Sequence, residues 1–545
     1  MTSNNKSCLI KNYLFLLLFL SAISKSVDAQ SKPNIIWITC EDISSFLPSY
    51  GDSTISTPNL SKLASEGIRY TRMFSTYGVC APTRSSIITG MYPNSIGSMN
   101  MRTVSVNRDN SFLPNYEAVP PPEVKCFTEY LRAAGYYCTN NAKTDYQFAP
   151  PITAWDENSK TASWRNRAAG QPFFAVFNIE ITHESQIWVR QNQPLRVDPA
   201  KVKVPPYYPQ NNPIIRKDIA RMYDNIMLMD DRVGQLLDQL RDDHLIDSTI
   251  IFFYSDHGGP IAWYKREPYD RGTLVPFIIR FPDKKHAGTS DDELHSFVDL
   301  APTMLSLAGL PVPVHLQGQP FLGTQKPMEP RQYIFTARDR MDGFYDLIRS
   351  ARDKQYRYVR NYDPDLIKYG DINYRKSMPM MKEILRLKDK DSLNSTLQQW
   401  FSSKMPEELY DEQNDPFELN NLAYDANYSD VLQRMRHEEQ NWVMKIRDKG
   451  FMQEKDLINL MWPGMVQPVT LKPVVEKINN QKNEVVLQIK CGTPGASIAY
   501  RLNTDPPETW HLYSHVITVP ASGSIRSKAI RIGYKESEES VYMNR

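Results

Sequence analysis

The sequence predicts an α/β protein built on a doubly wound sheet, followed by a smaller α+β subdomain and a β-sandwich module. Runs of consecutive apolar residues support the sheet, because a strand buried on both faces lacks polar alternation. They are NIIWIT (34–39), FFAVFNI (173–179), TIIFFYS (249–255) and, more weakly, GYYCT (135–139). Between the second and third runs, apolar residues recur three or four positions apart from Ile219 to Leu240, as in an amphipathic helix. This alternation of strands and helices predicts a doubly wound domain over residues 30–330.

The pattern changes twice after the α/β region. Residues 331–465 contain short polar-aromatic strands such as DKQYRYVRNY together with helical stretches, which indicates a smaller α+β subdomain. Residues 470–545 contain only strand-like segments, EVVLQIKC, ASIAYRL and SIRSKAIRI, separated by turns with Gly or Pro. We interpret this tail as an independent β-sandwich module.

Composition limits the classes of partner. The chain has 545 residues, a net charge of +2 and a charged fraction of 23%. Such a balance gives no overall field for a polyanion, so nucleic acid is not expected as a partner. A negatively charged substrate must instead be bound by local Arg and Lys side chains.

The N-terminus has the features of a cleaved signal peptide. Lys6 and Lys11 precede the apolar segment YLFLLLFLSAIS, and VDAQ offers a small-x-small cleavage site after Ala29. The apolar segment is too short for a permanent membrane helix. Cys8 precedes it and so cannot carry a lipid anchor. We therefore expect residues 1–29 to be removed, giving a periplasmic or secreted protein without a membrane anchor.

The cysteines are few and odd in number once the signal peptide is removed. This excludes a disulfide framework, although a bridge between Cys126 and Cys138 is left open. At least one thiol stays unpaired, which allows Cys80 a chemical role. The five are Cys40, Cys80, Cys126, Cys138 and Cys491.

Chemically active side chains follow each of the four apolar runs. In open α/β sheets, ligands bind beyond the carboxyl ends of the strands, so these side chains are expected to meet. Clustered carboxylates repel each other unless a cation neutralises them, and an oxygen-rich set favours Ca²⁺ over Mg²⁺. The histidine after 249–255 would be an unusual calcium ligand and is also a candidate substrate donor. The residues are Glu41 and Asp42 after 34–39, His183 after 173–179, Asp256 and His257 after 249–255, and Lys143 after 135–139.

One segment carries a specific resemblance. CAPTRSSIITG (80–90) resembles the C-x-P-x-R-x-x-x-x-T-G signature of type I sulfatases, in the alkaline phosphatase superfamily. Companion motifs occur in the family's order: Glu41-Asp42 at its Asp-Asp pair, SDHG (255–258) at its second metal pair, and ELYDEQNDPFELNNLA (408–423) near its C-terminal motif. The resemblance covers about residues 33–425. It implies an alkaline phosphatase-like fold, and looks closest to the heparan N-sulfatase branch and bacterial polysaccharide sulfatases.

The resemblance implies a mechanism centred on Cys80. A maturation enzyme would oxidise this residue to formylglycine, whose hydrate offers two hydroxyls: one attacks the sulfate ester, and deprotonation of the other expels sulfate. One Ca²⁺ would be held by Glu41, Asp42, Asp256, His257 and the modified Cys80.

The remaining roles also follow from motif position. Arg84 would support the nucleophile, Lys143 and Lys265 would hold sulfate oxygens, and His183 would protonate the leaving sugar oxygen. Arg266 competes with Lys265 for the second of these roles.

Two positions depart from the family pattern. Glu41 replaces the usual Asp, which flexible calcium geometry tolerates. Asp145 stands in AKTD where the family has the histidine of G-K-x-H. Asp145 is either the base of the second step or a residue that positions Lys143 through a salt bridge. We favour the positioning role, because a cation-rich pocket makes a carboxylate a poor base.

The substrate expected from these features is a sulfated polysaccharide or its oligosaccharides, either a glycosaminoglycan or an algal polymer such as ulvan. Arg338 and Arg340 are candidates to bind sugar carboxylates or sulfates. The β-module would either bind glycan or stabilise the enzyme. Two alternatives remain: a phosphate or phosphonate monoester hydrolase of the same superfamily, and a non-catalytic sulfoglycan-binding protein whose Cys80 is never oxidised.

Overall fold

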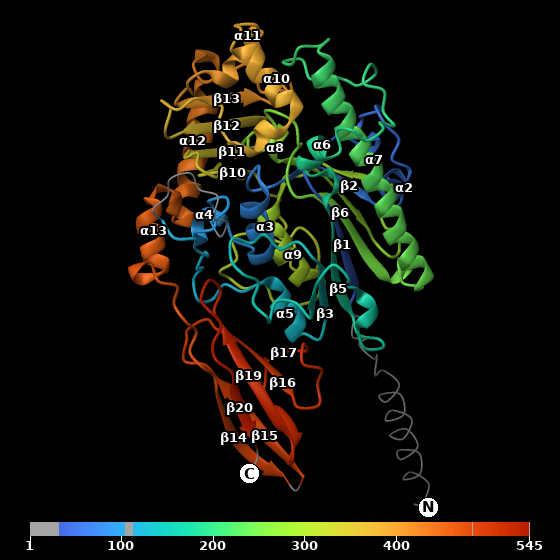
Figure 1. The fold of residues 1–545 in the computed structure, drawn as a ribbon, viewed down its shortest axis with the longest axis vertical. Coiled ribbons are helices and arrows are strands. Elements are labelled where there is room, and N and C mark those ends of the chain that lie inside the picture. Colours follow the sequence, from blue (N-terminus) through green and yellow to red (C-terminus); the bar gives the residue numbers. More distant parts are fainter. Residues whose placement is uncertain (1–31, 104–112, 482, 544–545) are drawn as a thin grey trace, which may run out of the picture.

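The computed structural model describes residues 32–103, 113–481 and 483–543, so the expected signal peptide lies outside the described residues. Its largest element is a nine-stranded sheet (Figure 1). No helix of the described residues is long and apolar enough to cross a membrane. In sheet order the strands are β4 (Glu157–Asn158), β3 (Tyr137–Asn141), β5 (Phe173–Ile179), β1 (Asn34–Cys40), β6 (Thr249–Ser255), β7 (Leu274–Arg280), β2 (Ile68–Phe74) and β8 (Ser290–Asp291), with β9 (His295–Ser296) beside β2.

The four apolar runs form β1, β3, β5 and β6, which lie side by side and run parallel. In the register, Trp37 of β1 lies opposite Val176 of β5 and Phe252 of β6. The carboxyl ends of these strands therefore share one edge of the sheet. On the other side of β6, β7 runs antiparallel to both β6 and β2.

Helices cover both faces of the sheet, as a doubly wound fold requires (Figure 1). Alternate residues of β1 point to opposite faces of the sheet. On one face, Ile36 and Ile38 pack with α2 (Pro58–Glu66) and α7 (Pro213–Asp242). Ile35 and Trp37 pack on the opposite face, in the cluster formed with helices α3 (Cys80–Thr89), α5 (Phe127–Ala133) and α9 (Leu300–Leu307). Continuous apolarity in β1 is thus explained by burial on both faces. The predicted fold class is confirmed.

A second, antiparallel sheet follows in the chain. Its order is β10-β11-β12-β13, and α12 packs across one face through Leu432 and Met435. The strands are β10 (Ile334–Arg338), β11 (Ile348–Arg352), β12 (Tyr356–Asn361) and β13 (Glu407–Asp411), and the helix is α12 (Ser429–Ile446). The shorter helices are α4 (Pro93–Ile96), α6 (Ser185–Val189), α8 (Asp270–Thr273), α10 (Pro379–Lys388), α11 (Ser395–Gln398) and α13 (Glu454–Met461).

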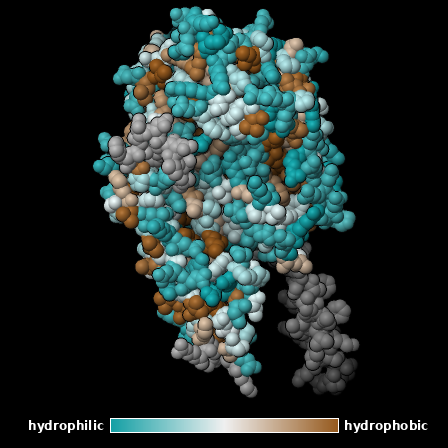
Figure 2. Space-filling model, viewed as in Figure 1, coloured by the Kyte–Doolittle hydropathy of each residue, from teal (hydrophilic) through white to brown (hydrophobic). Residues whose placement is uncertain are grey.

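The last strands form two small sheets packed face to face, which we call the β part. Its core contains Val485, Leu487, Val519 and Ile525. Figure 2 shows hydrophobic residues in small, separate groups over this part and over the rest of the visible face. The sheets are β14 (Val474–Gln481), β15 (Glu484–Lys490) and β18 (Ile517–Pro520), and β17 (His511–Leu512), β16 (Ser497–Leu502), β19 (Ser524–Ile530) and β20 (Ser540–Met543).

The β part is packed firmly against the α/β part. Ile532 is buried in the same core cluster as Trp462 and Ala118. At Gly533 the two backbones approach so closely that a Cβ would lie 2.3 Å from the carbonyl oxygen of Ala118. Lys125 Nζ donates to the Gly495 carbonyl at 2.6 Å. The predicted domain limits stay a prediction, but these contacts show that the β part shares a core with the preceding chain.

The described cysteines are all free thiols, including the buried Cys126 and Cys138. The bridge that the sequence left open between them is therefore not formed in this structure.

Candidate active site

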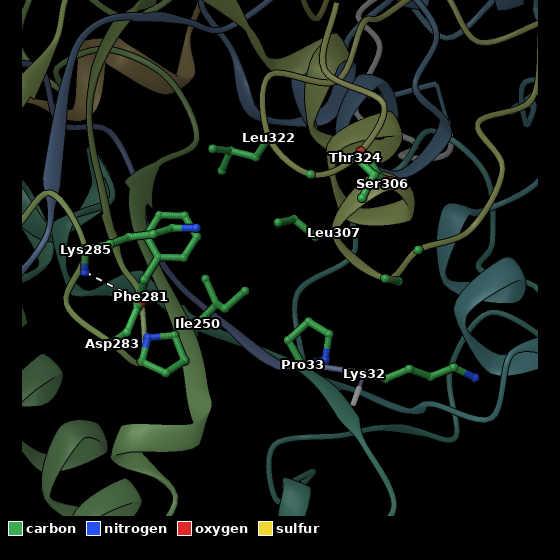
Figure 3. A pocket seen from close by; sticks show the side chains of 14 residues that line it. Lys32, Pro33, Ile250, Phe281, Asp283, Lys285, Ser306, Leu307, Leu322 and Thr324 are labelled. Carbon is green, nitrogen blue, oxygen red and sulfur yellow. Dashed lines mark hydrogen bonds between the residues drawn. The ribbon is translucent and has the colours of Figure 1, made fainter. Parts of the chain in front are cut away.

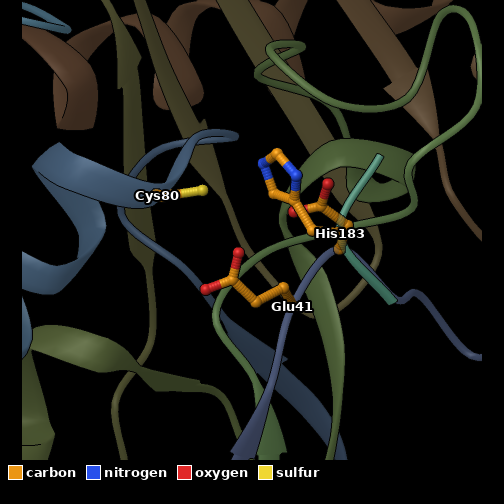
Figure 4. A group of neighbouring side chains, drawn as sticks. Glu41, Cys80 and His183 are labelled. Atoms are coloured by element: carbon orange, nitrogen blue, oxygen red, sulfur yellow. The ribbon is translucent and has the colours of Figure 1, made fainter. Parts of the chain in front are cut away.

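Cys80 is the first residue of α3 and its side chain is buried. Val79 before it is extended, and the Thr83 hydroxyl donates to the Tyr77 carbonyl at 2.8 Å, which fixes the chain where the helix begins. Pro82 fits here because the first N–H groups of a helix have no intrahelical acceptor. Figure 4 shows the Cys80 side chain pointing toward the space between Glu41 and His183.

Two basic groups face the sulfur of Cys80. Its Sγ lies 3.2 Å from His257 Nε2 and 3.6 Å from Lys265 Nζ. Burial raises the pKa of the Cys80 thiol, but the positive charges of Lys265 and His257 more than offset this, so its pKa lies below its usual value. The sulfur therefore occupies a buried, electropositive position, as a reactive residue requires.

The carboxylates that follow β1 and β6 meet beside Cys80. Cys40 pairs with Ser255 in the sheet, so the next residues of both strands lie together. Asp42 Oδ1 is 3.1 Å from His257 Nε2, and the Asp42 N–H donates to Asp256 Oδ1 at 3.2 Å. Asp42 has a φ of 52°, in the left-handed region, which Asp adopts more readily than most residues.

Three cations balance these carboxylates. Arg84, one helical turn after Cys80, donates from Nη2 to Glu41 Oε1 at 2.9 Å, and its Nε lies 3.3 Å from Asp256 Oδ2. Lys143 Nζ is 2.8 Å from a Glu41 oxygen, and Lys265 Nζ is 2.7 Å from Asp42 Oδ2. The site is thus rich in both charges and able to hold an anion.

The donor atoms also fit a divalent cation. Single donor atoms of Asp42, Cys80, Asp256 and His257 lie within 4.8 Å of one another, and a second such group contains Glu41, Asp42, Cys80 and His183. Buried carboxylate oxygens with one imidazole nitrogen are suited to a hard, oxygen-preferring ion. The five predicted metal ligands are therefore gathered at one place, with both Glu41 oxygens also facing Arg84 and Lys143.

His183 lies at the open side of this cluster and is partly exposed. Its Nδ1 is 2.8 Å from Ser185 Oγ, which fixes the ring. Burial and Lys265 lower the pKa of His183, but Asp42 and Cys80 raise it more, so the net pKa is above its usual value. A histidine that keeps its proton is suited to act as a general acid.

Known proteins resemble this chain over most of its length. The sulfatase family matches residues 33–310, and the C-terminal part of N-sulphoglucosamine sulphohydrolase matches residues 259–378. A relative 45% identical over 93% of this chain and 90% of its own length is an ulvan-active sulfatase of Formosa agariphila. The chain belongs to the sulfatase family. It is an enzyme that hydrolyses sulfate esters.

Two more distant comparisons agree with this assignment. Human N-sulphoglucosamine sulphohydrolase is 24% identical over 74% of this sulfatase and 90% of its own length. A structure solved in complex with its substrate D-glucosamine-2-N,6-O-disulfate superposes with a TM-score of 0.56 and 18% identity. That match covers 77% of this chain and 100% of the other, and it shows the shared fold.

Of the two adjacent bases in the sulfatase, Lys265 is the one that faces Cys80. The guanidinium of Arg266 turns away and donates from Nη1 to Glu184 Oε2 at 2.9 Å. Glu184 was not singled out from the sequence, but its backbone N–H also donates to Asp42 Oδ2 at 2.7 Å.

Asp145 is exposed on the loop after β3. Within the described residues, Lys143 pairs with Glu41 and no ion pair joins it to Asp145. The expected salt bridge is therefore absent here, and the ammonium of Lys143 is paired with the carboxylate of Glu41 instead. Whether Asp145 acts as base stays a prediction.

Arg338 and Arg340 are both buried. Arg338 Nη1 is 3.0 Å from Glu267, and Arg340 Nε is 2.6 Å from Glu454. Each guanidinium is already neutralised inside the protein, so the structure lends no support to the substrate-binding role predicted for them. That role depended on exposure, which the sequence does not report.

Asn178 is a residue of this site that the sequence analysis did not single out. Its Oδ1 accepts from Arg84 Nη1 at 2.8 Å and from Thr39 Oγ1 at 3.0 Å. Its Nδ2 donates to Asn140 Oδ1 at 3.0 Å and to the Asn141 carbonyl at 3.1 Å. The available signal was a lone polar residue near the carboxyl end of the apolar run FFAVFNI.

A pocket of about 560 Å³ lies at the other edge of the sheet (Figure 3). Pro33 and Ile250, at the amino ends of β1 and β6, and Phe281, Leu307 and Leu322 contribute to its lining. None of the predicted site residues lines it. The active site is therefore identified by its chemistry rather than by the size of a cavity.

Proposed function

We propose that this sulfatase is exported and removes sulfate from a sulfated algal polysaccharide such as ulvan, or from its oligosaccharides, using formylglycine made from Cys80 and one Ca²⁺. The 45% identity to an ulvan-active sulfatase over 93% of the chain carries the choice of substrate. The signal-peptide pattern of residues 1–29 supports export. The position of Cys80 at the start of α3, between Lys265 and His257, supports the choice of nucleophile.

The modification and the ion each supply a specific chemistry. Hydrated formylglycine supplies one hydroxyl to attack sulfur and a second whose deprotonation releases sulfate, whereas a thiol has no such exit. Ca²⁺, held by Glu41, Asp42, Asp256 and His257, would supply positive charge to the sulfate oxygens. The predominance of buried carboxylate oxygens in the donor set supports this choice of ion.

The side chains of this chain would carry out the rest of the reaction. Lys143 and Lys265, each paired with a carboxylate of the site, would hold sulfate oxygens. Arg84 would keep Glu41 and Asp256 in place behind the nucleophile. His183, fixed by Ser185 and partly exposed, would donate its proton to the leaving sugar oxygen.

The test is a sulfate-release screen. The protein is produced together with a formylglycine-generating enzyme and incubated with ulvan, heparan sulfate and chondroitin sulfate oligosaccharides, and free sulfate is measured by ion chromatography. We expect release from ulvan oligosaccharides, with Cys80→Ala as the inactive control. Faster hydrolysis of phosphate or phosphonate esters than of sulfate esters would favour the monoester hydrolase alternative. Binding of sulfated glycan without any turnover would favour the non-catalytic one.

Export is tested separately. N-terminal sequencing of the protein recovered from its native host should begin at Gln30, and a chain that retains residues 1–29 would refute the expected cleavage.

A further inference from the structure

Access to Cys80 is restricted to one side of the site. The groups that surround its sulfur are almost completely buried: Asp42 and His257 are 0% exposed, Asp256 is 1% and Lys265 is 3%. Of the described charged groups that we assign to the reaction, His183 and Lys143 are partly exposed, and Asp145 is exposed on the same loop as Lys143. A substrate must therefore reach the nucleophile on the side where these groups lie. Since His183 is placed to protonate the leaving oxygen, the leaving sugar lies against His183.

Two aromatic rings continue the surface outward from His183. The Tyr374 ring centroid is 6.3 Å from that of His183, and the Trp188 centroid is 5.2 Å from that of Tyr374 at an angle of 76°. Trp188 and Tyr374 are both partly exposed. They come from distant parts of the chain: Trp188 from α6 and Tyr374 from the 3₁₀ turn Tyr374–Ser377. Two rings brought together from separate segments thus form one wall beside the catalytic histidine.

Neighbouring contacts hold this wall in place. Arg102 lies over the Tyr374 ring at 4.8 Å from the centroid, and its Nε is 2.7 Å from Asp342. Trp188 packs at the edge of the core on the α7 side of the sheet, whereas Tyr374 packs at the edge of the core on the α3 side. Rings anchored in this way lose little conformational entropy when a ligand binds. The free energy of their contacts with the ligand is therefore not offset by a large cost of ordering the rings.

The wall has the chemistry of a sugar site. A pyranose ring has an apolar C–H surface bordered by hydroxyls, and partly exposed Tyr and Trp rings offer a large apolar face with a polar edge.

We propose that Trp188 and Tyr374 form the subsite that binds the sugar ring carrying the scissile sulfate, immediately next to His183. This proposal rests on the proposed function, because it requires a saccharide leaving group. It separates two parts of the site: the buried charges recognise sulfate, and the aromatic wall recognises the sugar.

The experiment uses two inhibitors that contact different parts of the site. Inorganic sulfate reaches only the buried charges, whereas the desulfated oligosaccharide reaches only the sugar subsite. For Trp188→Ala and Tyr374→Ala, we expect the KM for the sulfated oligosaccharide and the Ki of the desulfated product to rise about tenfold or more. The Ki of inorganic sulfate should stay within about twofold of wild type, since the sulfate-binding groups are unchanged.

Matched variants make the result specific. Tyr424→Ala removes a tyrosine that is 62% exposed elsewhere in the C-terminal half, and it should leave all three constants unchanged. Tyr374→Phe keeps the ring and should restore the KM. If Tyr374→Ala fails to fold, Tyr374→Leu keeps apolar bulk without the ring and should show the same rise.

The failures of the two proposals are distinguishable. A wild-type enzyme that releases no sulfate from any saccharide contradicts the proposed function. An active wild type whose Trp188 and Tyr374 variants keep the wild-type KM and product Ki overturns the subsite alone, as does an equal rise in the Ki of inorganic sulfate.

Discussion

Replacing Asn178 by Ala should lower turnover without removing any charged group. In the structure the Arg84 guanidinium has three partners: Glu41 at 2.9 Å, Asp256 at 3.3 Å and Asn178 at 2.8 Å. Asn178 is the uncharged partner, and it also ties Arg84 to the loop that carries Lys143. That link runs through Asn140, whose Oδ1 accepts from Asn178 and whose Nδ2 donates to the Lys143 carbonyl at 3.1 Å.

The magnitude follows from the bonds that are lost. A hydrogen bond to a charged group contributes about 1.5–3 kcal/mol, and a donor left buried and unpaired adds to the cost. If the loss appears mainly in the transition state, where Arg84 and Lys143 must both be in place, kcat falls by about 10- to 100-fold at 1.36 kcal/mol for each factor of ten. KM for the oligosaccharide should change less, because the sugar-binding wall is untouched.

The assay is steady-state sulfate release, with thermal unfolding measured in parallel. Asn158→Ala is the matched control, because its Oδ1 accepts from Asn140 Nδ2 at 2.9 Å without contacting Arg84, and its kcat should stay within about twofold. Asn178→Asp keeps the acceptor for Arg84 but loses the donor to Asn140, so its kcat should lie between those of wild type and the Ala variant. If Asn178→Ala keeps the wild-type kcat and only unfolds at a lower temperature, Asn178 has no role in positioning Arg84.

Three further predictions concern the nucleophile, the ion and stability. Cys80→Ala should release no sulfate, and mass spectrometry of the active wild type should show CHO in place of CH₂SH at residue 80; an active preparation containing only thiol would refute the mechanism. Asp42→Ala and Asp256→Ala should each lose bound metal in elemental analysis, because each removes a buried oxygen donor, whereas full activity in metal-free wild type would exclude the ion. Burial raises the pKa of Asp218, and the hydrogen bond that its carboxylate accepts from the Met380 N–H lowers it by less, so the net pKa is about 7. Since the folded pKa lies above the unfolded one, Asp218 favours folding below about pH 4 and loses this contribution as pH rises to about 7. Asp218→Asn should therefore be more stable than wild type at pH 8, by up to roughly 4 kcal/mol for a shift of about three pH units. Equal pH dependence of urea unfolding in both proteins would contradict this.

The sequence was sufficient for the parts of the fold that depend on local pattern. Continuous apolar runs identify β1, β5 and β6, because each is buried on both faces. Amphipathic spacing identifies α7. The antiparallel placement of β7 between β6 and β2 was not predictable, since strand order depends on long-range packing. The insertion of Ile532 into the main core was missed for the same reason.

The active site also has a part that local sequence pattern predicts and a part that depends on long-range packing. Glu41 and Asp256 were predictable as neighbours once both were placed after buried parallel strands. Asn178 was not, because a single Asn in a strand does not reveal that its amide faces an arginine. The surroundings of Arg338 and Arg340 were not predictable for a related reason. Whether an Arg faces substrate depends on carboxylates far away in the chain, such as Glu267 and Glu454.

The contact between Ile532 and the main core has a consequence for the order of events during synthesis. Trp462 and Ala118 are buried in a cluster that also contains Ile532, close to the end of the chain. A growing chain cannot close this part of the core until residue 532 has been made. The pairing of the central strand β1 is delayed in a similar way, because its partners β5 and β6 lie far along the chain. A product that stops before residue 532 would therefore expose apolar surface of this core to proteases.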